Sequence, residues 1–542
     1  MLSLSLLLSV FRMIVLPVEF QDRAFSATPA QLSEAVRQAE VYFNRQYGGK
    51  TTFEFTLAEV TTLSHETAWY GANLPDRKDI HLADAVREAC TQQQGNINFS
   101  LYDNDSDGFV DVVFLLTAGP GENDSGEESD IWPQNARLSE QGGTLDIRGK
   151  RIDVFAACPE GLPGIFRHEF GHTLGLPDFY DLDGEDSGGR SPGRWGLSIM
   201  DEGCLKKTFP DFGALEYELL GLGRSEDLAP GHWQLEPLDK GRRYLKTGSE
   251  DEFFLFECRD GALYVSHVDR SDNPSGFDAR QGREITARER WKLNAINNNP
   301  DHLCARLVPA DPEARTAEGI PFAPGGRDRF SSDTPAPFRT WDGLPVGLAL
   351  TDICSEADGS VSFDVIEPLR FAEFSIYQDA AVIRWKASDA LLRISGYTIS
   401  WSDGGEDGGT LELGPGEISG TLEGLQPKTG YNVTVQAHTA DLGSFSVATR
   451  IVTKVYREGT YPYIYLNNTQ RNLDGSFPSG SKIPLRVFNA TQVQEIQWSL
   501  NGVRIAPEAD GNYTLRQSGL LAARILHTDG NIETIYKEIT VQ

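Results

Sequence analysis

The sequence predicts a multidomain protein in which an α/β (α+β) domain comes first and all-β regions, ending in β-sandwiches, follow. Three observations support this fold class. The chain has 542 residues, enough for three or four domains that each bury a core. Strand-like and helix-like segments alternate early in the chain, whereas short strands at regular spacing fill the part after Pro368. The 54 Gly and 28 Pro residues indicate many turns, as β-rich regions require.

The charge balance narrows the classes of partner. The formal net charge is −30, from 79 acidic and 49 basic residues. A charge of this sign argues against nucleic acid and against anionic membrane surfaces as partners. It favours a soluble secreted protein that binds divalent cations.

The cysteines leave two interpretations open. None of them shows the CxxC spacing of a metal site. If the protein is exported, disulfides are expected, but the sequence does not choose among the pairings. Buried free thiols are an equal alternative. The six residues are Cys90, Cys158, Cys204, Cys258, Cys304 and Cys354.

The N-terminal segment, residues 1–11, reads MLSLSLLLSVF and is apolar. It lacks the basic region and the small-residue cleavage site of a clear signal peptide. It is also too short to span a bilayer. We interpret it as the remnant of a leader or a misplaced start, and no other segment of the sequence predicts membrane insertion.

The next hundred residues alternate between strand and helix patterns. Met13–Phe20 is a short run of Ile, Val and Leu, which predicts a buried strand. Pro29–Tyr47 has apolar residues at helical spacing and predicts a helix. Thr51–Val60 alternates as a strand does, and Ile80–Thr91 predicts a second helix. This order indicates an α/β core.

An acidic loop follows, which begins at Asp103. It has carboxylates at Asp103, Asp105, Asp107 and Asp111 and a glycine at its sixth position, Gly108. This spacing matches the first half of an EF-hand-type Ca²⁺ loop. The twelfth position is Phe114, so the bidentate Glu of that loop is missing, and a strand follows in place of a helix. We predict a strand-linked calcium loop. The alternative is an Asx-rich turn with solvated carboxylates.

The strand after this loop, Val112–Gly119, also has two interpretations. It either supplies the edge on which a peptide lies by strand addition, or is a buried central strand. Residues 119–130 are acidic and Gly-rich, and they form either the rim of a cleft or a mobile surface loop.

The rest of the chain is organised around HEFGHTLGLPD, His168–Asp178. On a helix, His168 and His172 share one face and can bind one Zn²⁺. Glu169 lies beside the metal but is poorly placed to bind it, which suits a general base acting on water. Gly175 lets the helix end and the chain turn back, so that Asp178 falls where a third ligand is needed. A pair of helical histidines is more often structural, but the added Gly and Asp favour the HExxHxxGxxD metal site.

A second motif lies downstream in WGLSIMDEG, Trp195–Gly203, and fits the Met-containing turn that lies under the zinc in metzincins. The two motifs together closely resemble the immune inhibitor A-type bacterial metallopeptidases. The resemblance covers roughly residues 12–366 and includes IVLPVEFQD, DGFVDVVFLLTAGPGE, LYVSHVDRSD and WDGLPVGLALTDI.

What this resemblance implies is a metzincin-like catalytic domain, and with it a secreted zinc endopeptidase with bound calcium. The third ligand departs from the metzincins at large, because Asp178 stands where a His is usual, and Asp181 is the fallback. Asp181 and Asp183 either bind a second Ca²⁺ or cap the turn.

Other side chains near the motif carry weaker signals. A thiolate at Cys158 either ligates zinc in a latent state or pairs with Cys204, and a plain structural role is favoured over latency. Tyr180 and Tyr217 either hydrogen-bond the tetrahedral intermediate or are core aromatics with a polar tip. His267 follows a β-run, and a structural role is favoured over one in the cleft.

The predicted domains are 1–227, the peptidase domain, and 228–366, its β-rich continuation, then 367–455 and 456–542. Residues 367–455 resemble a fibronectin type III sandwich, in which Trp385 is the core tryptophan and Tyr431 the corner tyrosine. Residues 456–542 resemble an immunoglobulin-like sandwich with Trp498 between its sheets.

We therefore predict a zinc endopeptidase that hydrolyses protein or peptide substrates with metal-activated water and Glu169 as general base. Its location is inferred from the resemblance as secreted, cell-surface or periplasmic. The alternative is a surface adhesion or glycan-binding protein that carries an inactive peptidase scaffold. The intact HExxH argues against that alternative, and fold alone assigns the sandwiches no more than a spacer or adhesive role.

Overall fold

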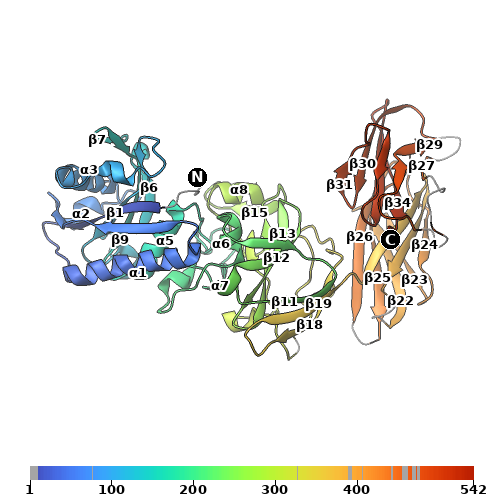
Figure 1. The fold of residues 1–542 in the computed structure, drawn as a ribbon, viewed down its shortest axis with the longest axis horizontal. Coiled ribbons are helices and arrows are strands. Elements are labelled where there is room, and N and C mark those ends of the chain that lie inside the picture. The colour runs from blue at the N-terminus through green and yellow to red at the C-terminus, as the bar shows by residue number, and fades with distance from the viewer. Residues whose placement is uncertain are drawn as a thin grey trace.

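The protein is seen here as a computed structural model, which describes residues 10–542 except 76, 326, 389–392, 406, 441–442, 455–461, 467–471 and 473–475. An α/β unit lies at one end, a mixed β unit in the middle and two β-sandwich-like units at the other end (Figure 1). Most of the apolar N-terminal segment, residues 1–9, lies outside the described residues. Within the described part of the chain, none of the helices combines the length and apolarity needed to cross a membrane.

The N-terminal unit is built on one twisted sheet with the order β2-β1-β5-β9-β6. Neighbouring strands run parallel except at β6, which pairs antiparallel with β9. The strands are β1 (Val10–Glu19), β2 (Thr52–Leu57), β5 (Val113–Thr117), β6 (Gln134–Arg137) and β9 (Val154–Pro159), with β3 (Thr61–Thr62) beside β1. The strand expected at Val112–Gly119 is therefore central, and β2 and β6 stand at the two ends of this strand order.

Both faces of this sheet are covered, as the apolar runs of its strands require. Along β1, Phe11, Met13 and Val15 pack into one core cluster together with residues of α1 (Pro29–Tyr47) and α5 (Pro163–Thr173). The alternate residues Ile14, Leu16 and Val18 pack into a second cluster with α3 (Leu82–Gln93). Figure 1 shows α1 and α5 on one side of the sheet and α3 on the other.

Helix α1 begins and ends where its sequence directs. Thr28 accepts from the backbone N–H of Gln31, whose side chain returns the contact in a capping box, and Pro29 takes the first turn. Gly48 ends the helix with φ +53°. The remaining elements of this unit are α2 (Thr67–Tyr70), η1 (Phe99–Tyr102), β4 (Phe109–Val110), α4 (Glu122–Ser125), η2 (Leu138–Glu140), β7 (Leu145–Ile147), β8 (Lys150–Ile152), η3 (Glu202–Leu205) and α6 (Ala214–Leu219).

The middle unit is built on a five-stranded sheet of order β10-β12-β13-β14-β17 and a three-stranded sheet of order β11-β19-β18. Its elements are β10 (Arg224–Asp227), β11 (Gly231–Leu235), α7 (Leu238–Gly241), β12 (Arg243–Gly248), β13 (Glu252–Arg259), β14 (Ala262–Asp269), β15 (Pro274–Asp278), β16 (Arg283–Thr286), α8 (Ala287–Lys292), β17 (Ala305–Leu307), η4 (Ala317–Gly319), β18 (Ala349–Ser355) and β19 (Val361–Ile366).

The first two units share one hydrophobic core. Phe253 and Leu255 of β13 belong to the same buried cluster as Phe170 of α5 and Met200. Because this cluster crosses the predicted boundary at residue 227, we expect the two units to be stable as one body.

Two all-β units follow. The first has sheets β20-β21-β24 and β23-β22-β25-β26, with Trp385 fully buried between them and the Tyr431 hydroxyl accepting from the backbone N–H of Gln426. In the second, whose main sheet is β31-β30-β33-β34, Trp498 belongs to β30 and is buried. The strands are β20 (Leu369–Ile376), β21 (Ala380–Ala387), β22 (Ile394–Ser402), β23 (Gly408–Leu413), β24 (Ser419–Glu423), β25 (Gly430–Thr439), β26 (Ser444–Val452), β27 (Tyr463–Tyr465), β28 (Lys482–Pro484), β29 (Arg486–Phe488), β30 (Val493–Leu500), β31 (Val503–Ile505), β32 (Asn512–Thr514), β33 (Gly519–His527) and β34 (Ile532–Ile539).

A buried carboxyl group supports the start of the edge strand β6. Asp79 is fully buried, and its Oδ2 accepts from the backbone N–H of Trp132 at 3.0 Å and from the Gln134 side chain at 2.7 Å. Its Oδ1 is buried without a hydrogen bond within the described part of the chain. Burial raises the pKa of Asp79 to about 7.

This pKa predicts how stability depends on pH. Because the folded pKa of Asp79 lies above its ordinary value, its contribution to stability is complete below pH 3.8 and is lost as pH rises through about 7. Relative to Asp79→Asn, we expect the wild type to lose up to about 1.4 kcal/mol per pH unit in this window. Urea unfolding at several pH values measures the difference, with the exposed Asp301→Asn as control. A difference between wild type and Asp79→Asn that does not change with pH would contradict the prediction.

Candidate metal centre

Helix α5 presents the two motif histidines and then ends sharply. Pro163 occupies its first turn, and His168 and His172 lie one turn apart on the same face. Gly175 has φ +97°, a conformation that few other residues adopt, and the chain turns back there. A side chain at Gly171 would meet the sulfur of Met200 at 2.4 Å, so glycine allows this close approach beneath the helix.

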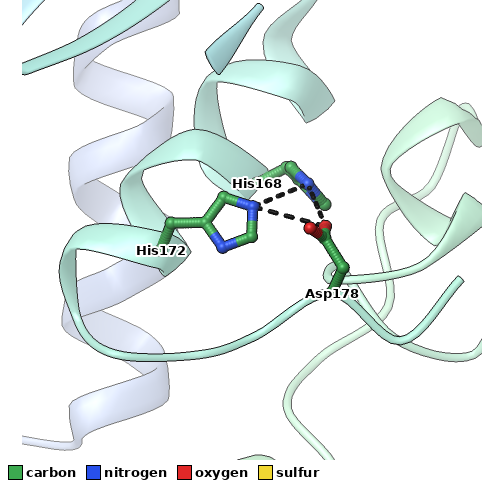
Figure 2. Close-up of side chains that lie close together, drawn as sticks. All are labelled: His168, His172 and Asp178. Carbon is green, nitrogen blue, oxygen red and sulfur yellow. Dashed lines mark hydrogen bonds and ion pairs between the residues drawn. The ribbon is translucent and has the colours of Figure 1, made fainter. Parts of the chain in front are cut away.

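The turn brings three ligand-type atoms together, as Figure 2 shows. The Nε2 atoms of His168 and His172 are 3.2 Å apart. Asp178 Oδ1 lies 3.0 Å from the first and 3.3 Å from the second. His168 and Asp178 are buried, and His172 is partly exposed. These three residues therefore form a compact cluster that opens toward solvent on the His172 side.

Backbone carbonyls fix the orientation of both imidazoles. His168 Nδ1 lies 3.0 Å from the carbonyl oxygen of Ile199, and His172 Nδ1 lies 2.9 Å from that of Leu176. A carbonyl can only accept, so each Nδ1 donates and each Nε2 lone pair faces the cluster. Ile199 belongs to the WGLSIMDEG segment, so that segment supports the first histidine. This arrangement is typical of metal-ligating histidines.

The donor set fits zinc. Ligands at Zn²⁺ distances of about 2.0–2.2 Å in tetrahedral geometry lie about 3.3–3.6 Å apart, close to the three separations seen here. Asp178 Oδ1 is also buried and makes no hydrogen bond within the described part of the chain. A buried carboxylate oxygen without a hydrogen bond is costly unless a cation compensates it.

The charges of the cluster are strongly coupled. Burial lowers the pKa of His168 and His172, but the Asp178 carboxylate offsets this and raises both overall. Burial raises the pKa of Asp178, and the two imidazoles outweigh that effect and hold its pKa well below the usual range. In this arrangement the carboxylate is ionised, as a metal ligand must be.

Glu169 is buried on the same helix, next to this cluster. Burial raises its pKa above the ordinary value, and the neighbouring imidazoles offset part of this rise. A carboxylate with a raised pKa accepts a proton more readily than an exposed one, which suits general-base chemistry.

The structure separates Asp181 and Asp183 from this cluster. The Asp181 carboxylate accepts from three backbone N–H groups, those of Asp183, Gly184 and Ser191. The Asp183 carboxylate accepts from the Ser187 hydroxyl. These contacts match the turn-capping interpretation, and Asp178 is the carboxylate that meets the histidines.

The acidic loop is brought together in part. Asp103, Asp105 and Asp107 each offer a carboxylate oxygen within 4.8 Å of the others, and Asp103 is paired with the Lys150 ammonium. Asp111 is not in this group, because its Oδ2 accepts from the backbone and side-chain N–H groups of Asn104. The group that could hold an ion comprises three carboxylates, and a ligand role for Asp111 stays a prediction.

The weaker candidates have ordinary surroundings. The Cys158 thiol is buried and contacts the carbonyl oxygens of Pro159 and Leu162, and all six cysteines are free. His267 is fully buried and contacts Glu252 at 2.8 Å. The ring of Tyr180 lies 5.9 Å from that of His168, whereas Tyr217 is buried and bonds to Gln46.

One contact at the cluster has no signal in the sequence. Asn294 donates to Asp178 Oδ2 at 2.6 Å and accepts from the Asp178 backbone N–H at 2.9 Å. It is 116 residues away in the chain, so no local motif spacing points to it.

Two parts of the chain match known protein families. Residues 15–211 match the family model described as immune inhibitor A peptidase M6, catalytic domain, and residues 368–451 match the fibronectin type III domain. A pre-pro-metalloprotease PrtV of Vibrio cholerae serotype O1 is 27% identical over 191 residues, which are 30% of this chain and 20% of that protein. Immune inhibitor A of Bacillus thuringiensis subsp. alesti is 25% identical over 195 residues, 30% of this chain and 28% of that protein.

Among solved structures, the fibronectin type III domain of human collagen alpha-1(XX) chain is 23% identical, covers 17% of this chain and 83% of that chain, and has a TM-score of 0.15.

The N-terminal unit is thus of the metallopeptidase class. It carries a peptidase M6 domain of the immune inhibitor A type, and a fibronectin type III domain lies in the C-terminal part. The matched segments span only 20% and 28% of the two curated relatives.

The cluster predicts that zinc stabilises the folded protein. After removal of metals by a chelator, added Zn²⁺ at about a thousand times its Kd is expected to stabilise the wild type by about 4 kcal/mol, because the unfolded chain lacks the site. His172→Ala removes one ligand and is expected to lose this gain, as measured by thermal unfolding. His232→Ala, at an exposed His–Asp pair far from the cluster, is the control. Equal stabilisation of His172→Ala and wild type would exclude this site.

Proposed function

We propose that the N-terminal part of the chain is the catalytic unit of a secreted zinc-dependent endopeptidase with a metzincin-like site. His168, His172 and Asp178 hold Zn²⁺, and Glu169 is the general base. The observation that carries the proposal is the convergence of two imidazole Nε2 atoms and one carboxylate oxygen beside a buried glutamate. When bound, Zn²⁺ supplies Lewis acidity toward a water molecule and a peptide carbonyl.

The side chains of the cluster have separate tasks. The Nδ1–H bonds to the carbonyls of Ile199 and Leu176 hold both imidazoles with their lone pairs inward. Glu169 takes a proton from the attacking water and passes it to the leaving amine of the peptide. The same buried carboxyl must first gain and then lose a proton.

The edge strand β6 supports a peptide as substrate. Within the described part of the chain no strand pairs with its outer edge, so its backbone groups on that side are available to an extended chain. The side chain of Asn135, on β6, bonds to Thr173 at the end of the metal-binding helix. A cavity of about 260 Å³ lined by residues of β6 also contacts His172. A peptide added to β6 would therefore pass the metal centre.

Export and calcium belong to the same proposal. One relative is a pre-pro-metalloprotease by name, which supports export of the matched domain. The three clustered carboxylates of Asp103, Asp105 and Asp107 are proposed to bind Ca²⁺, supported by a buried Oδ1 of Asp103 that makes no hydrogen bond among the described residues.

A substitution of the base tests the catalytic proposal. Glu169→Gln keeps the size of the side chain but cannot accept the proton, so casein hydrolysis is expected to fall by a factor of about 10²–10⁴ or more while zinc content is unchanged. Glu34→Gln, at an exposed ion pair on α1, is the matched control. If Glu169→Gln hydrolyses casein at the wild-type rate, Glu169 is not the base.

A metal titration tests the calcium proposal. Asp105→Asn with Asp107→Asn removes two charged ligands, so Ca²⁺ is expected to raise the Tm of the wild type but not of this variant. Each kcal/mol of binding free energy is worth about 2–4 °C. Asp510→Asn, at an exposed ion pair in the last unit, is the control. The same Ca²⁺-dependent rise in the double variant would contradict the assignment.

A further inference from the structure

The segment that carries the third metal ligand has little regular structure of its own. Residues 178–187 follow the end of α5 and contain neither helix nor strand. A backbone bond from Phe179 N–H to the Met200 carbonyl, at 2.8 Å, ties the segment to the peptidase domain. A carboxylate on such a loop needs further support if it is to meet two histidines in a fixed position.

Asn294 supplies that support at the ligand itself. It lies two residues after α8 in the middle unit. Its amide makes two hydrogen bonds to Asp178, one as a donor and one as an acceptor. Its Nδ2 donates to Asp178 Oδ2, and its Oδ1 accepts from the Asp178 backbone N–H. The carboxylate is thereby held through Oδ2, and Oδ1 faces the imidazoles.

The residue type suits this position for two reasons. Asn294 has φ +54°, a left-handed conformation that asparagine tolerates better than most residues. Its amide is also uncharged, so it orients the Asp178 carboxylate without neutralising it. A lysine or arginine at this place would compete with the metal for the same negative charge.

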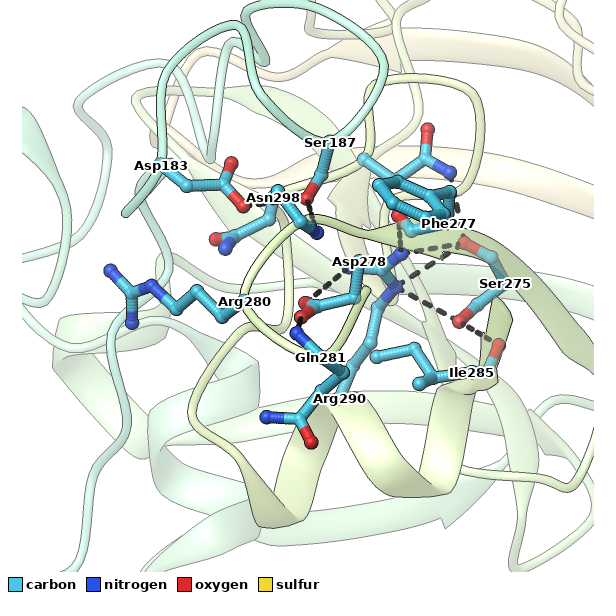
Figure 3. Close-up of polar contacts among 12 residues, drawn as sticks. Asp183, Ser187, Ser275, Phe277, Asp278, Arg280, Gln281, Ile285, Arg290 and Asn298 are labelled. Carbon is cyan, nitrogen blue, oxygen red and sulfur yellow. Dashed lines mark hydrogen bonds and ion pairs between the residues drawn. The ribbon is translucent and has the colours of Figure 1, made fainter. Parts of the chain in front are cut away.

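The middle unit holds the rest of the loop in the same way. The Asn297 side chain donates to the Phe179 carbonyl, and that of Asn298 accepts from the Leu182 backbone N–H. Both asparagines are fully buried. In Figure 3, Asn298 lies beside the loop carrying Asp183 and faces the β15–β16 hairpin.

That hairpin adds two contacts and is itself anchored. Arg280 donates to the Leu182 carbonyl, and the Ala279 backbone N–H donates to the Ser187 hydroxyl. The fully buried Arg290 donates to backbone carbonyls of the hairpin strand β15 (Figure 3). The contacts to the ligand loop therefore come from a rigid part of the middle unit.

We propose that Asn294 is a positioning residue for the third metal ligand, and that the middle unit completes the metal centre through it. This rests on the proposed zinc site. The family match ends at residue 211, before Asn294, so the positioning group lies outside the matched catalytic domain. Zinc affinity then depends on a contact between the two units.

Asn294→Gly tests the proposal, because glycine keeps the left-handed backbone and removes only the amide. Zinc affinity, measured by competition with a chromophoric chelator in the full chain, is expected to fall about 10–100-fold. The matched control is Asn501→Gly in the last unit. Asn501 has φ +51° and makes the same two kinds of bond, to the Ser518 carbonyl and from the Leu520 N–H. It is expected to leave zinc affinity unchanged.

The visible absorption of the Co²⁺-substituted protein gives a second measurement. A tilted carboxylate changes the coordination geometry, so the Co²⁺ spectrum of Asn294→Gly is expected to differ from that of wild type, and that of Asn501→Gly is not. If Asn294→Gly does not fold, Asn294→Ser, which keeps a smaller hydrogen-bonding group, is expected to show a smaller loss in the same direction.

The outcomes separate the two proposals. A wild type that binds no zinc overturns the proposed function and this inference with it. A wild type that binds zinc, with Asn294→Gly at wild-type affinity and with the wild-type Co²⁺ spectrum, overturns this inference alone. An equal loss in Asn294→Gly and Asn501→Gly also overturns it, because the effect would then not be specific to the ligand.

Discussion

The structure of the site depends on one contact, that of the Asp178 carboxylate with the imidazoles of His168 and His172 inside the protein. Removing a charged carboxylate from water is costly unless it is paired and hydrogen-bonded. Asp178 Oδ1 faces the two imidazoles, and Asn294 donates the hydrogen bond to Oδ2. The turn at Gly175 makes the contact possible, because it brings residues six apart in the chain to a few ångströms.

The same contact explains why the first two units are joined so closely. The loop that carries Asp178 has no regular structure, and the middle unit supplies hydrogen bonds that hold it. The shared cluster that includes Phe170, Met200 and Phe253 makes this junction a continuous core instead of a flexible linker. The predicted division at residue 227 therefore separates two sheets, but it does not separate two independent cores.

The C-terminal units are attached differently. The fibronectin type III domain contacts the middle unit through a small buried cluster of Ala349, Ile366 and Phe445. Polar groups add to it, with Ser446 N–H donating to Ser332 and the Ser446 hydroxyl bonding to Asp333. The last unit packs beside it, with Phe374 and Tyr536 rings 5.0 Å apart and an ion pair from Lys537 to Glu373. Its immunoglobulin-like type stays a prediction. A spacer or adhesive role fits these contacts, but the intact cluster of His168, His172 and Asp178 favours a peptidase over an inactive scaffold.

The sequence by itself determined the elements whose signals are local. His168, His172 and Gly175 lie in one helix or directly after it, so their spacing in the sequence predicts their arrangement. The buried face of α1 follows from the helical spacing of its apolar residues. The tertiary structure decided what depends on distant partners. It placed Val113–Thr117 in the centre of the sheet, bonded Asp111 to Asn104, and brought Asn294 to Asp178. Sequence spacing determines which residues are neighbours along the chain. Strand order, and a contact between residues 116 positions apart, form only when the hydrophobic cores assemble.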